Sequence, residues 1–140
     1  LGIEIELTDD GLRIRIPGRV LFKPGKVQLK SGAWDVMQDL TKVIAQSPLP
    51  TRIDGHESVK TDDSLTNNDW ELSLLRASAL LRFLVRRGNL DPARIIAAGH
   101  GAHRPLRNID ENGADYANER YEIVILANAD FTKGYITRGK

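Results

Sequence analysis

Short segments rich in branched residues alternate along this chain with two longer segments whose apolar residues recur every three or four positions. Residues 12–16 alternate apolar and basic side chains, which is the period of a half-buried strand, and Pro17-Gly18 ends this segment. Residues 52–56, 94–99 and 121–126 are the other predicted strands, and the last is rich enough in branched residues to lie inside a sheet. The alternation predicts helices packed on a sheet.

Two amphipathic helices are predicted between the strands. The first ends near Ser47-Pro48, and its apolar face is formed by Ala33, Val36, Met37, Leu40, Val43 and Ile44. In the second, Asn68 stands three residues before Glu71 in a capping arrangement, and Gly88-Asn89 ends the helix. Its predicted buried residues are Leu72, Leu75, Ala79, Phe83 and Leu84. The order is β-α-β-α-β-loop-β, and strands joined through helices imply parallel neighbours in a mixed sheet.

The length of 140 residues suits one domain, which we expect to span residues 1–128, with residues 129–140 as a flexible tail. Lys and Arg (20) nearly balance Asp and Glu (19), so no overall field favours nucleic acid. The absence of cysteine excludes disulfides and thiolate metal sites. No apolar run is long enough to cross a membrane, and we expect any targeting or anchoring element to lie outside this chain.

Five short motifs stand in order along the chain, and together they resemble those of the OmpA-like family. They are VLFKPG through LK at residues 20–30, IDGH at 53–56, NDWELS with RA at 68–77, DPARI leading to GHG and RP at 91–105, and NERYEI at 118–123. The third motif is similar to the helix start of the family's MotB-like branch. The resemblance covers residues 20–125 and implies the family's α/β (α+β) fold, a sandwich of helices on a mixed four-stranded sheet.

The resemblance also implies a function. It predicts a non-catalytic periplasmic domain that binds the peptidoglycan stem peptide, whose diaminopimelate presents an ammonium and a carboxylate on one carbon. It further implies a homodimer, tethered to the inner membrane by an amino-terminal segment not in this chain, as in a motor stator. No cofactor and no metal is implied. The expected ligand-binding residues are Arg76, Ser58, Leu72, Asn68 and Arg120.

The expected site departs from the family pattern in its charges. In the family an Asp and an Arg meet the zwitterion, through charge-assisted hydrogen bonds that are about twice as strong as neutral ones. The Arg is present as Arg76, but Ser58 stands at the position of the Asp. Because a hydroxyl carries no charge, we expect binding to be weaker by about tenfold to a hundredfold. Asp115 and Glu119 stand where the family has arginines.

Two alternatives remain open from the residues alone. Arg76 has a purely structural interpretation, as an exposed helix arginine paired with Glu71 or Glu57. Glu57 is not expected to replace the missing Asp, because neighbouring residues on an extended strand point to opposite faces. The changed charges also allow an OmpA-like scaffold that has lost its ligand and serves as a protein-interaction or dimerisation module.

Catalytic and metal-binding functions are disfavoured. Ser58, His56 and Asp54 are too close in sequence to form a triad without sharp folding, and no GxSxG motif accompanies them. His56, His100 and His103 follow strands that would bring them close together, but no cysteine helps them and the family uses no metal. The sequence therefore predicts neither an enzyme nor a zinc site.

Overall fold

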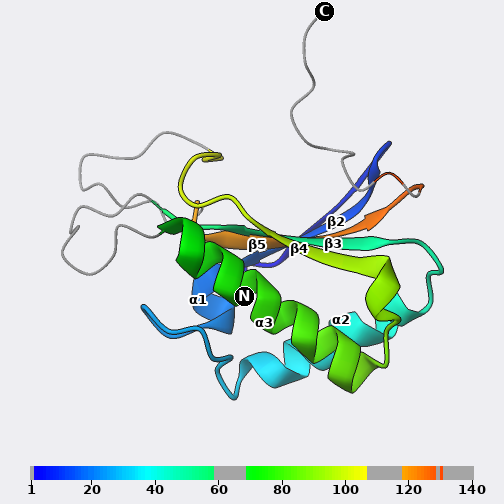
Figure 1. The fold of residues 1–140 in the computed structure, drawn as a ribbon, viewed down its shortest axis with the longest axis horizontal. Helices are drawn as coiled ribbons and strands as arrows, with labels where there is room; N and C mark the ends of the chain where they lie inside the picture. The colour runs from blue at the N-terminus through cyan, green and yellow to red at the C-terminus, as the bar shows by residue number, and fades with distance from the viewer. Residues whose placement is uncertain (1, 59–68, 107–117, 129, 131–140) are drawn as a thin grey trace, which may run out of the picture.

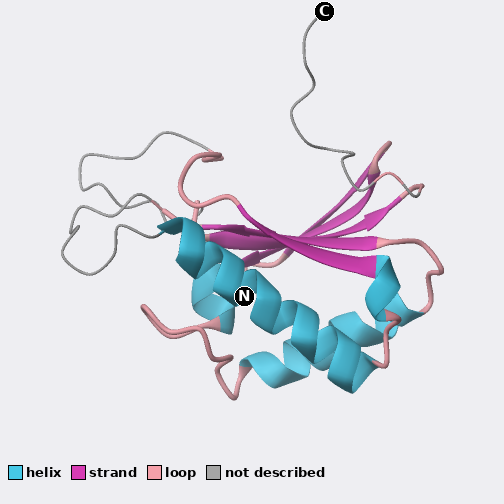
Figure 2. Cartoon of the chain, viewed as in Figure 1, coloured by secondary structure: helices cyan, strands magenta, loops and turns pink. Residues whose placement is uncertain are grey.

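The computed structural model describes residues 2–58, 69–106, 118–128 and 130. Within these residues one sheet runs in the order β1-β2-β5-β3-β4, and the helices pack on one of its faces (Figures 1 and 2). The strands are β1 (Glu4–Thr8), β2 (Gly11–Pro17), β3 (Thr51–His56), β4 (Ile95–Gly99) and β5 (Arg120–Leu126). The helices are α1 (Gly18–Leu21), α2 (Ala33–Ala45) and α3 (Asp69–Gly88), with a short 3-10 turn η1 (Pro92–Arg94) before β4.

The predicted fold of helices on a mixed sheet is confirmed, with one correction: the sheet has five strands rather than four. The additional strand, β1, forms a hairpin with β2, in which Thr8 pairs with Gly11. Its apolar side chains Ile5 and Leu7 are 66% and 81% exposed. β1 therefore extends the sheet at its edge without adding a buried layer. It lies outside the core, and the period of the buried apolar residues does not reveal it.

The sheet is mixed because it contains both parallel and antiparallel pairs of strands. β3 and β4 are parallel and are joined through α3, as the sequence predicts. β5 lies between β2 and β3 and is antiparallel to both. Every residue of β5 is buried, which agrees with the branched composition that placed it inside the sheet.

The core lies between the sheet and the helices. Alternate residues of the strands face the helices, among them Ile14, Ile16, Ile53 and Ile123. They meet a stripe of helix residues formed by Met37, Leu40, Ile44, Ala77, Leu80 and Leu84. The intervening strand residues point to the opposite face of the sheet, which carries no helix in the described residues (Figure 2).

The residues predicted to be buried on α2 and α3 are buried or partly buried in the structure, with two exceptions. In α2, Val43 is exposed although the other predicted core residues are buried or partly buried. In α3, Leu75 is 46% exposed, whereas Ser73 and Arg76 are buried. The buried face of α3 is therefore rotated from the predicted one and includes polar residues in its first two turns.

Two glycines allow this polar part of α3 to lie directly on the sheet. A Cβ atom at Gly55 would lie 2.4 Å from the carbonyl oxygen of Ser73, and one at Gly99 would lie 2.7 Å from the amide nitrogen of Leu74. Because both neighbouring atoms belong to the backbone, any side chain at these positions would push the helix away. The close approach fixes where the side chain of Arg76 enters the core.

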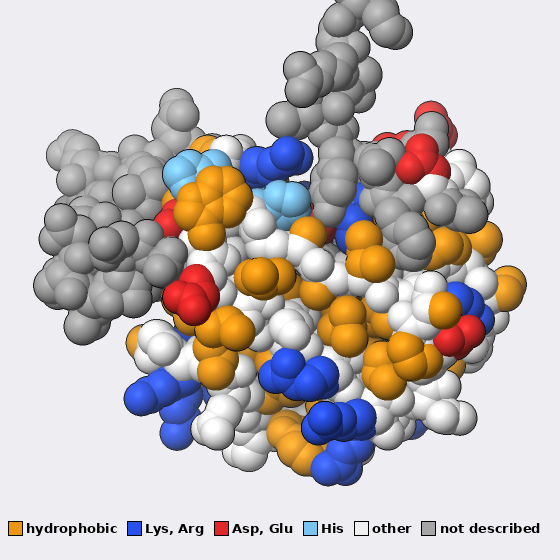
Figure 3. Space-filling model, in the orientation of Figure 1, with side chains coloured by type: hydrophobic (Ala, Val, Ile, Leu, Met, Phe, Trp, Pro, Cys, Tyr) orange, Lys and Arg blue, Asp and Glu red, His pale blue; other side chains and the backbone are white. Residues whose placement is uncertain are grey.

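The surface of the helix layer is mixed in character. Figure 3 shows apolar side chains spread over this face, with Lys and Arg side chains gathered at its lower edge. Exposed apolar residues of α3 include Trp70, Leu74 and Leu75. Among the described residues, no helix has both the length and the apolar character that a membrane crossing requires. The predicted tail falls on residues 129–140, of which the structure describes only Asp130.

Candidate functional site

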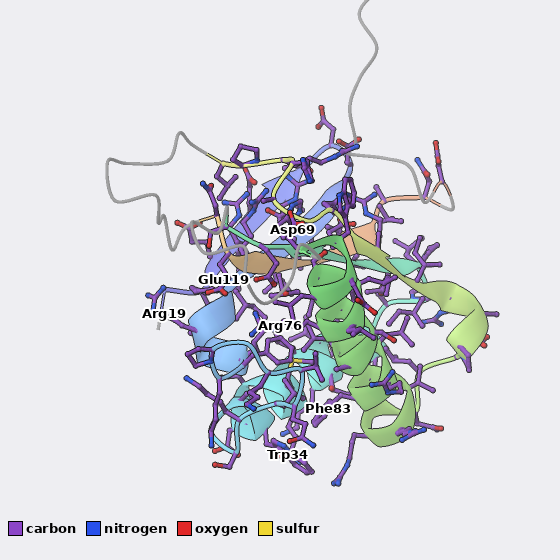
Figure 4. All side chains as sticks on the ribbon, turned by 60° about the vertical axis from the view of Figure 1, so that its left-hand side comes forward. Arg19, Trp34, Asp69, Arg76, Phe83 and Glu119 are labelled. Atoms are coloured by element: carbon purple, nitrogen blue, oxygen red, sulfur yellow. The ribbon has the colours of Figure 1, made fainter. Side chains whose placement is uncertain are left out.

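Arg76, the main predicted ligand contact, is a buried residue. Only 1% of it is exposed, and it lies between α3 and α1 beside Glu119 (Figure 4). Its Nε donates to the carbonyl oxygen of Lys26 at 2.7 Å, and its Nη2 donates to that of Lys23 at 3.0 Å. The guanidinium also lies over the ring of Phe22, 4.9 Å from the centroid. Arg76 thus ties α3 to the segment that follows α1.

Glu57 supplies the main countercharge, which is one of the pairings that the structural interpretation of Arg76 named, although this arginine is buried rather than exposed. Arg76 Nη1 donates to both carboxylate oxygens of Glu57, at 3.2 and 3.4 Å. Glu57 lies one residue beyond β3, and its backbone N–H donates to the carbonyl of Gly101 at 2.8 Å. The strand alternation therefore continues past His56, and Glu57 shares the helix-facing side with Gly55.

Two further side chains, Tyr121 and Glu119, complete the cluster around Arg76 and Glu57. The hydroxyl of Tyr121, on β5, donates to Glu57 Oε2, and the Tyr121 ring packs edge-on against Phe22 with centroids 5.4 Å apart. Glu119 lies on the outer side, with its Oε2 3.4 Å from Arg76 Nη1 and 24% of its side chain exposed. Arg76 is therefore held by an inner carboxylate that is fully buried and an outer one that contacts solvent.

The charges of the cluster are strongly stabilised. Burial alone would lower the pKa of Arg76, but the carboxylate of Glu57, with smaller contributions from Tyr121 and Glu119, raises it above its usual value. Burial, and then the negative charge of Glu57, raises the pKa of Tyr121 well above its ordinary range. Arg76 thus stays charged and Tyr121 stays a hydrogen-bond donor at any physiological pH.

The structure does not bring all five predicted ligand residues together. Ser58 directly follows Glu57 and is half-buried, and Leu72 is half-buried one turn before Arg76. Arg120 is elsewhere: its Nε donates to Glu122 at 2.9 Å and its Nη2 to the carbonyl of Arg104 at 3.0 Å. Because Arg120 alternates with Tyr121 along β5, it lies on the opposite face of the sheet. Asn68 and Asp115 lie outside the described residues.

Sequence reasoning named Glu57 only as a partner of an exposed Arg76, and it did not name Tyr121 as a member of the site. The period-two pattern through Ile53, Gly55 and Glu57 was the signal that would have found Glu57. Tyr121 carried a weaker signal, since it alternates with Ile123 and so falls on the same face of the sheet. Glu57 stands one residue after the IDGH motif, and Tyr121 lies inside NERYEI but was not among the residues expected to bind the ligand.

The histidines form a separate arrangement. The rings of His56 and His100 stack with centroids 4.6 Å apart, and His100 Nε2 lies 2.9 Å from Asp54 Oδ1. His103 stacks instead on the exposed ring of Trp70, at 4.5 Å. In the part of the chain that the structure describes, no group of three or more histidine, cysteine or acidic residues is arranged to hold a metal ion.

Comparisons with known proteins agree with the motifs. A model of the OmpA family matches residues 21–120. Motility protein B of Bacillus subtilis (strain 168) is 25% identical over 127 residues, which cover 89% of this chain and 48% of that protein. The chain thus spans about half the length of the curated relatives that it matches.

Two solved structures have closely similar folds. The periplasmic domain of Helicobacter pylori MotB superposes with a TM-score of 0.79 at 18% identity, over 94% of this chain and 85% of that one. The cell wall anchor of the T6SS from Pseudomonas aeruginosa superposes with a TM-score of 0.78 at 20% identity, over 90% and 88% of the two chains. These likenesses extend over nearly the whole described domain.

Proposed function

Because the chain belongs to the OmpA family, we propose that it is a non-catalytic, peptidoglycan-associating domain of the bacterial periplasm. The similarity to Motility protein B and to a cell wall anchor supports this assignment. The observation that carries it is the position of Arg76, which the close packing of α3 on Gly55 and Gly99 directs to the end of β3 and β5. There the resemblance expects the stem peptide to bind.

We propose that the ligand carboxylate reaches Arg76 by displacing Glu119. The contact between Arg76 and Glu119 is long, at 3.4 Å, and the Glu119 side chain is partly in water, so it is the weaker of the two ion pairs. Glu57 would stay in place because it is buried and also accepts from Tyr121. Once Glu119 is displaced, the hydroxyl of Ser58 would accept from the ligand ammonium.

A second function is favoured by a specific observation. Glu119 pairs with Arg76 on its outer side, and only 1% of the arginine is exposed. If Glu119 is not displaced, the domain is an OmpA-like scaffold that no longer binds the stem peptide and acts through protein contacts. The ligand-binding function is preferred because the covering residue is itself partly exposed and singly paired among the described residues.

The test is co-sedimentation of the purified domain with insoluble peptidoglycan. We expect the wild-type domain to pellet, and free diaminopimelate stem peptide to release it. Glu119→Gln removes the competing charge and should increase the bound fraction, whereas Glu71→Gln, on an exposed face of α3, should leave it unchanged. No pelleting by either the wild type or Glu119→Gln would establish the scaffold function instead.

For the whole protein, we propose a MotB-like arrangement in which two copies are tethered to the inner membrane through a segment outside this chain. The exposed edge strand β1, with Ile5 and Leu7 in solvent, supports pairing between copies because edge strands template further strands. Light scattering at high protein concentration should detect a dimer. A strictly monomeric domain in that measurement would argue against a pairing surface within this chain.

A further inference from the structure

A second charged cluster lies on the face of the sheet that carries no helix in the described residues. Side chains from β2, β3 and β5, with three from the segment after β4, surround a cavity of about 180 Å³. Five of the lining residues are arginines: Arg13, Arg15, Arg52, Arg104 and Arg120. Because a water molecule takes about 30 Å³ of liquid, the cavity has room for a small ion with a few waters.

Two acidic residues of the described chain, Glu122 and Asp54, line this cavity. Glu122 is shared among three arginines, with its carboxylate oxygens 2.9 Å from Arg120 Nε, 3.0 Å from Arg15 Nε and 3.6 Å from Arg13 Nε. Asp54 pairs with Arg52 at 2.7 Å. Among the described residues, the cavity lining thus places five arginines against two carboxylates.

Two further acids stand at the rim. Glu4 pairs with Arg15 at 3.1 Å and Glu6 with Arg13 at 3.8 Å, but both carboxylates come from edge strand β1 and are mostly exposed. Exposed pairs are screened by solvent and contribute little. The arginines also repel one another: the pKa of Arg120 is lowered, mainly by burial, and Arg15 and Arg13 lower it further. Counted over the described lining residues alone, the cavity therefore has more positive than negative side chains.

Two buried nitrogen atoms of the cavity lining have no hydrogen-bond partner within the described residues. They are Nε of Arg13 and Nδ1 of His56. His56 is 4% exposed and lines the cavity. Burial, followed by the charge of Arg120, lowers its pKa to about 3, so the ring is neutral and can donate one N–H. A buried donor without a partner is costly, and a bound acceptor would remove that cost.

We propose that this cavity binds a small oxyanion of the phosphate class, on the opposite face of the sheet from Arg76. Guanidinium groups match tetrahedral phosphate oxygens through paired N–H donors, and they approach here from three strands rather than from one side. The Nε of Arg13 and the Nδ1 of His56 supply the two donors that have no hydrogen-bond partner among the described residues. The ligand is either free phosphate or the terminal group of a phosphate ester.

The experiment titrates the 140-residue chain with inorganic phosphate at constant ionic strength, and in parallel with glycerol phosphate. Constant ionic strength is needed because any salt screens the arginines. Phosphate should bind saturably and shift the ring ¹⁵N signals of His56, which requires no variant. Arg13→Gln should weaken binding by at least about tenfold, since a charged hydrogen bond is lost. Arg86→Gln, on the exposed end of α3, is the matched control and should bind as the wild type does.

The outcomes separate cleanly. Binding of both compounds identifies a phosphate ester as an admissible ligand, and binding of inorganic phosphate alone identifies the free ion. The proposal is overturned if phosphate does not saturate, if the His56 signals do not move, or if Arg86→Gln weakens binding as much as Arg13→Gln. Peptidoglycan sedimentation does not depend on this cavity, so either function can fail without the other.

Discussion

Arg76 is a cation in the protein interior, and its surroundings explain how that is tolerated. Its donors reach two carboxylates and two backbone carbonyls, and its charged plane lies over an aromatic ring. Moving an ion pair out of water is costly unless such partners are in place. The same arrangement means that the loss of one partner leaves the other as a buried, unpaired charge.

Replacing Arg76 should therefore unfold the domain more easily. Arg76→Met leaves Glu57 buried without its countercharge, and we expect the free energy of unfolding to fall by about 3–5 kcal/mol in urea titrations. Arg82→Met, on an exposed part of the same helix, is the control and should stay within about 0.5 kcal/mol of the wild type. Equal stability of the two variants would contradict the structural role of Arg76.

At this scale the sequence predicted the importance of Arg76 but not its environment. Motif resemblance placed the residue at the site, because the helix start carries the family pattern. Burial was not predictable from the apolar spacing of α3, since an arginine is normally read as a surface residue. It becomes buried only because Glu57 and Tyr121, from distant parts of the chain, meet it in three dimensions.

Helix α3 carries Arg76 and so positions the site. Two glycines of the sheet, Gly55 and Gly99, set how closely this helix approaches the strands. Gly55 and Gly99 stand on the neighbouring parallel strands β3 and β4, opposite each other in register. Both meet the backbone of α3 in its first two turns. The helix can therefore lie closer to this end of the sheet than side chains would permit.

Gly99→Ala should test this packing. The new Cβ would lie 2.7 Å from the amide nitrogen of Leu74, so the helix must shift, and we expect a loss of about 1–3 kcal/mol of stability. Gly32→Ala is the matched control, because no atom lies within 4 Å of its Cβ position, and its stability should be unchanged or slightly raised. Thermal denaturation of the two variants measures the difference; a Gly99→Ala protein as stable as Gly32→Ala would mean that α3 is not held by this contact.

The long periodic elements were the most predictable. α2, α3 and the four strands of the core were all located, because each presents a sustained apolar face to the interior. β1 was not located, since its apolar residues Ile5 and Leu7 remain in solvent and pair only along one edge. The buried face of α3 was also not predictable in its first two turns. There the helix contacts Gly55 and Gly99 and buries the polar residues Ser73 and Arg76, so the apolar spacing does not mark its inner side.

For the molecule as a whole, the sheet separates two charged clusters. In one, a single arginine meets two carboxylates, and in the other, three arginines meet one carboxylate. On the helix side, Arg76 is held by Glu57 and by Glu119, which lies beside it in Figure 4. On the other side, Arg13, Arg15 and Arg120 share Glu122. Of the ligand residues that the sequence motifs implied, only Arg120 belongs to the second cluster. The cluster around Glu122 was not predicted, because its polar residues alternate with apolar ones along β2, β3 and β5. Such alternation is typical of a sheet face that is exposed to solvent.

The central claim is that the Arg76 end of this domain receives the zwitterion of the stem peptide. The most direct measurement is calorimetric titration of a diaminopimelate-containing stem peptide into the wild type and into Ser58→Asp. Because the variant restores a carboxylate for the ligand ammonium, we expect both proteins to bind and the variant to bind about tenfold more tightly. Absence of binding by both proteins, with both folded, would contradict the claim.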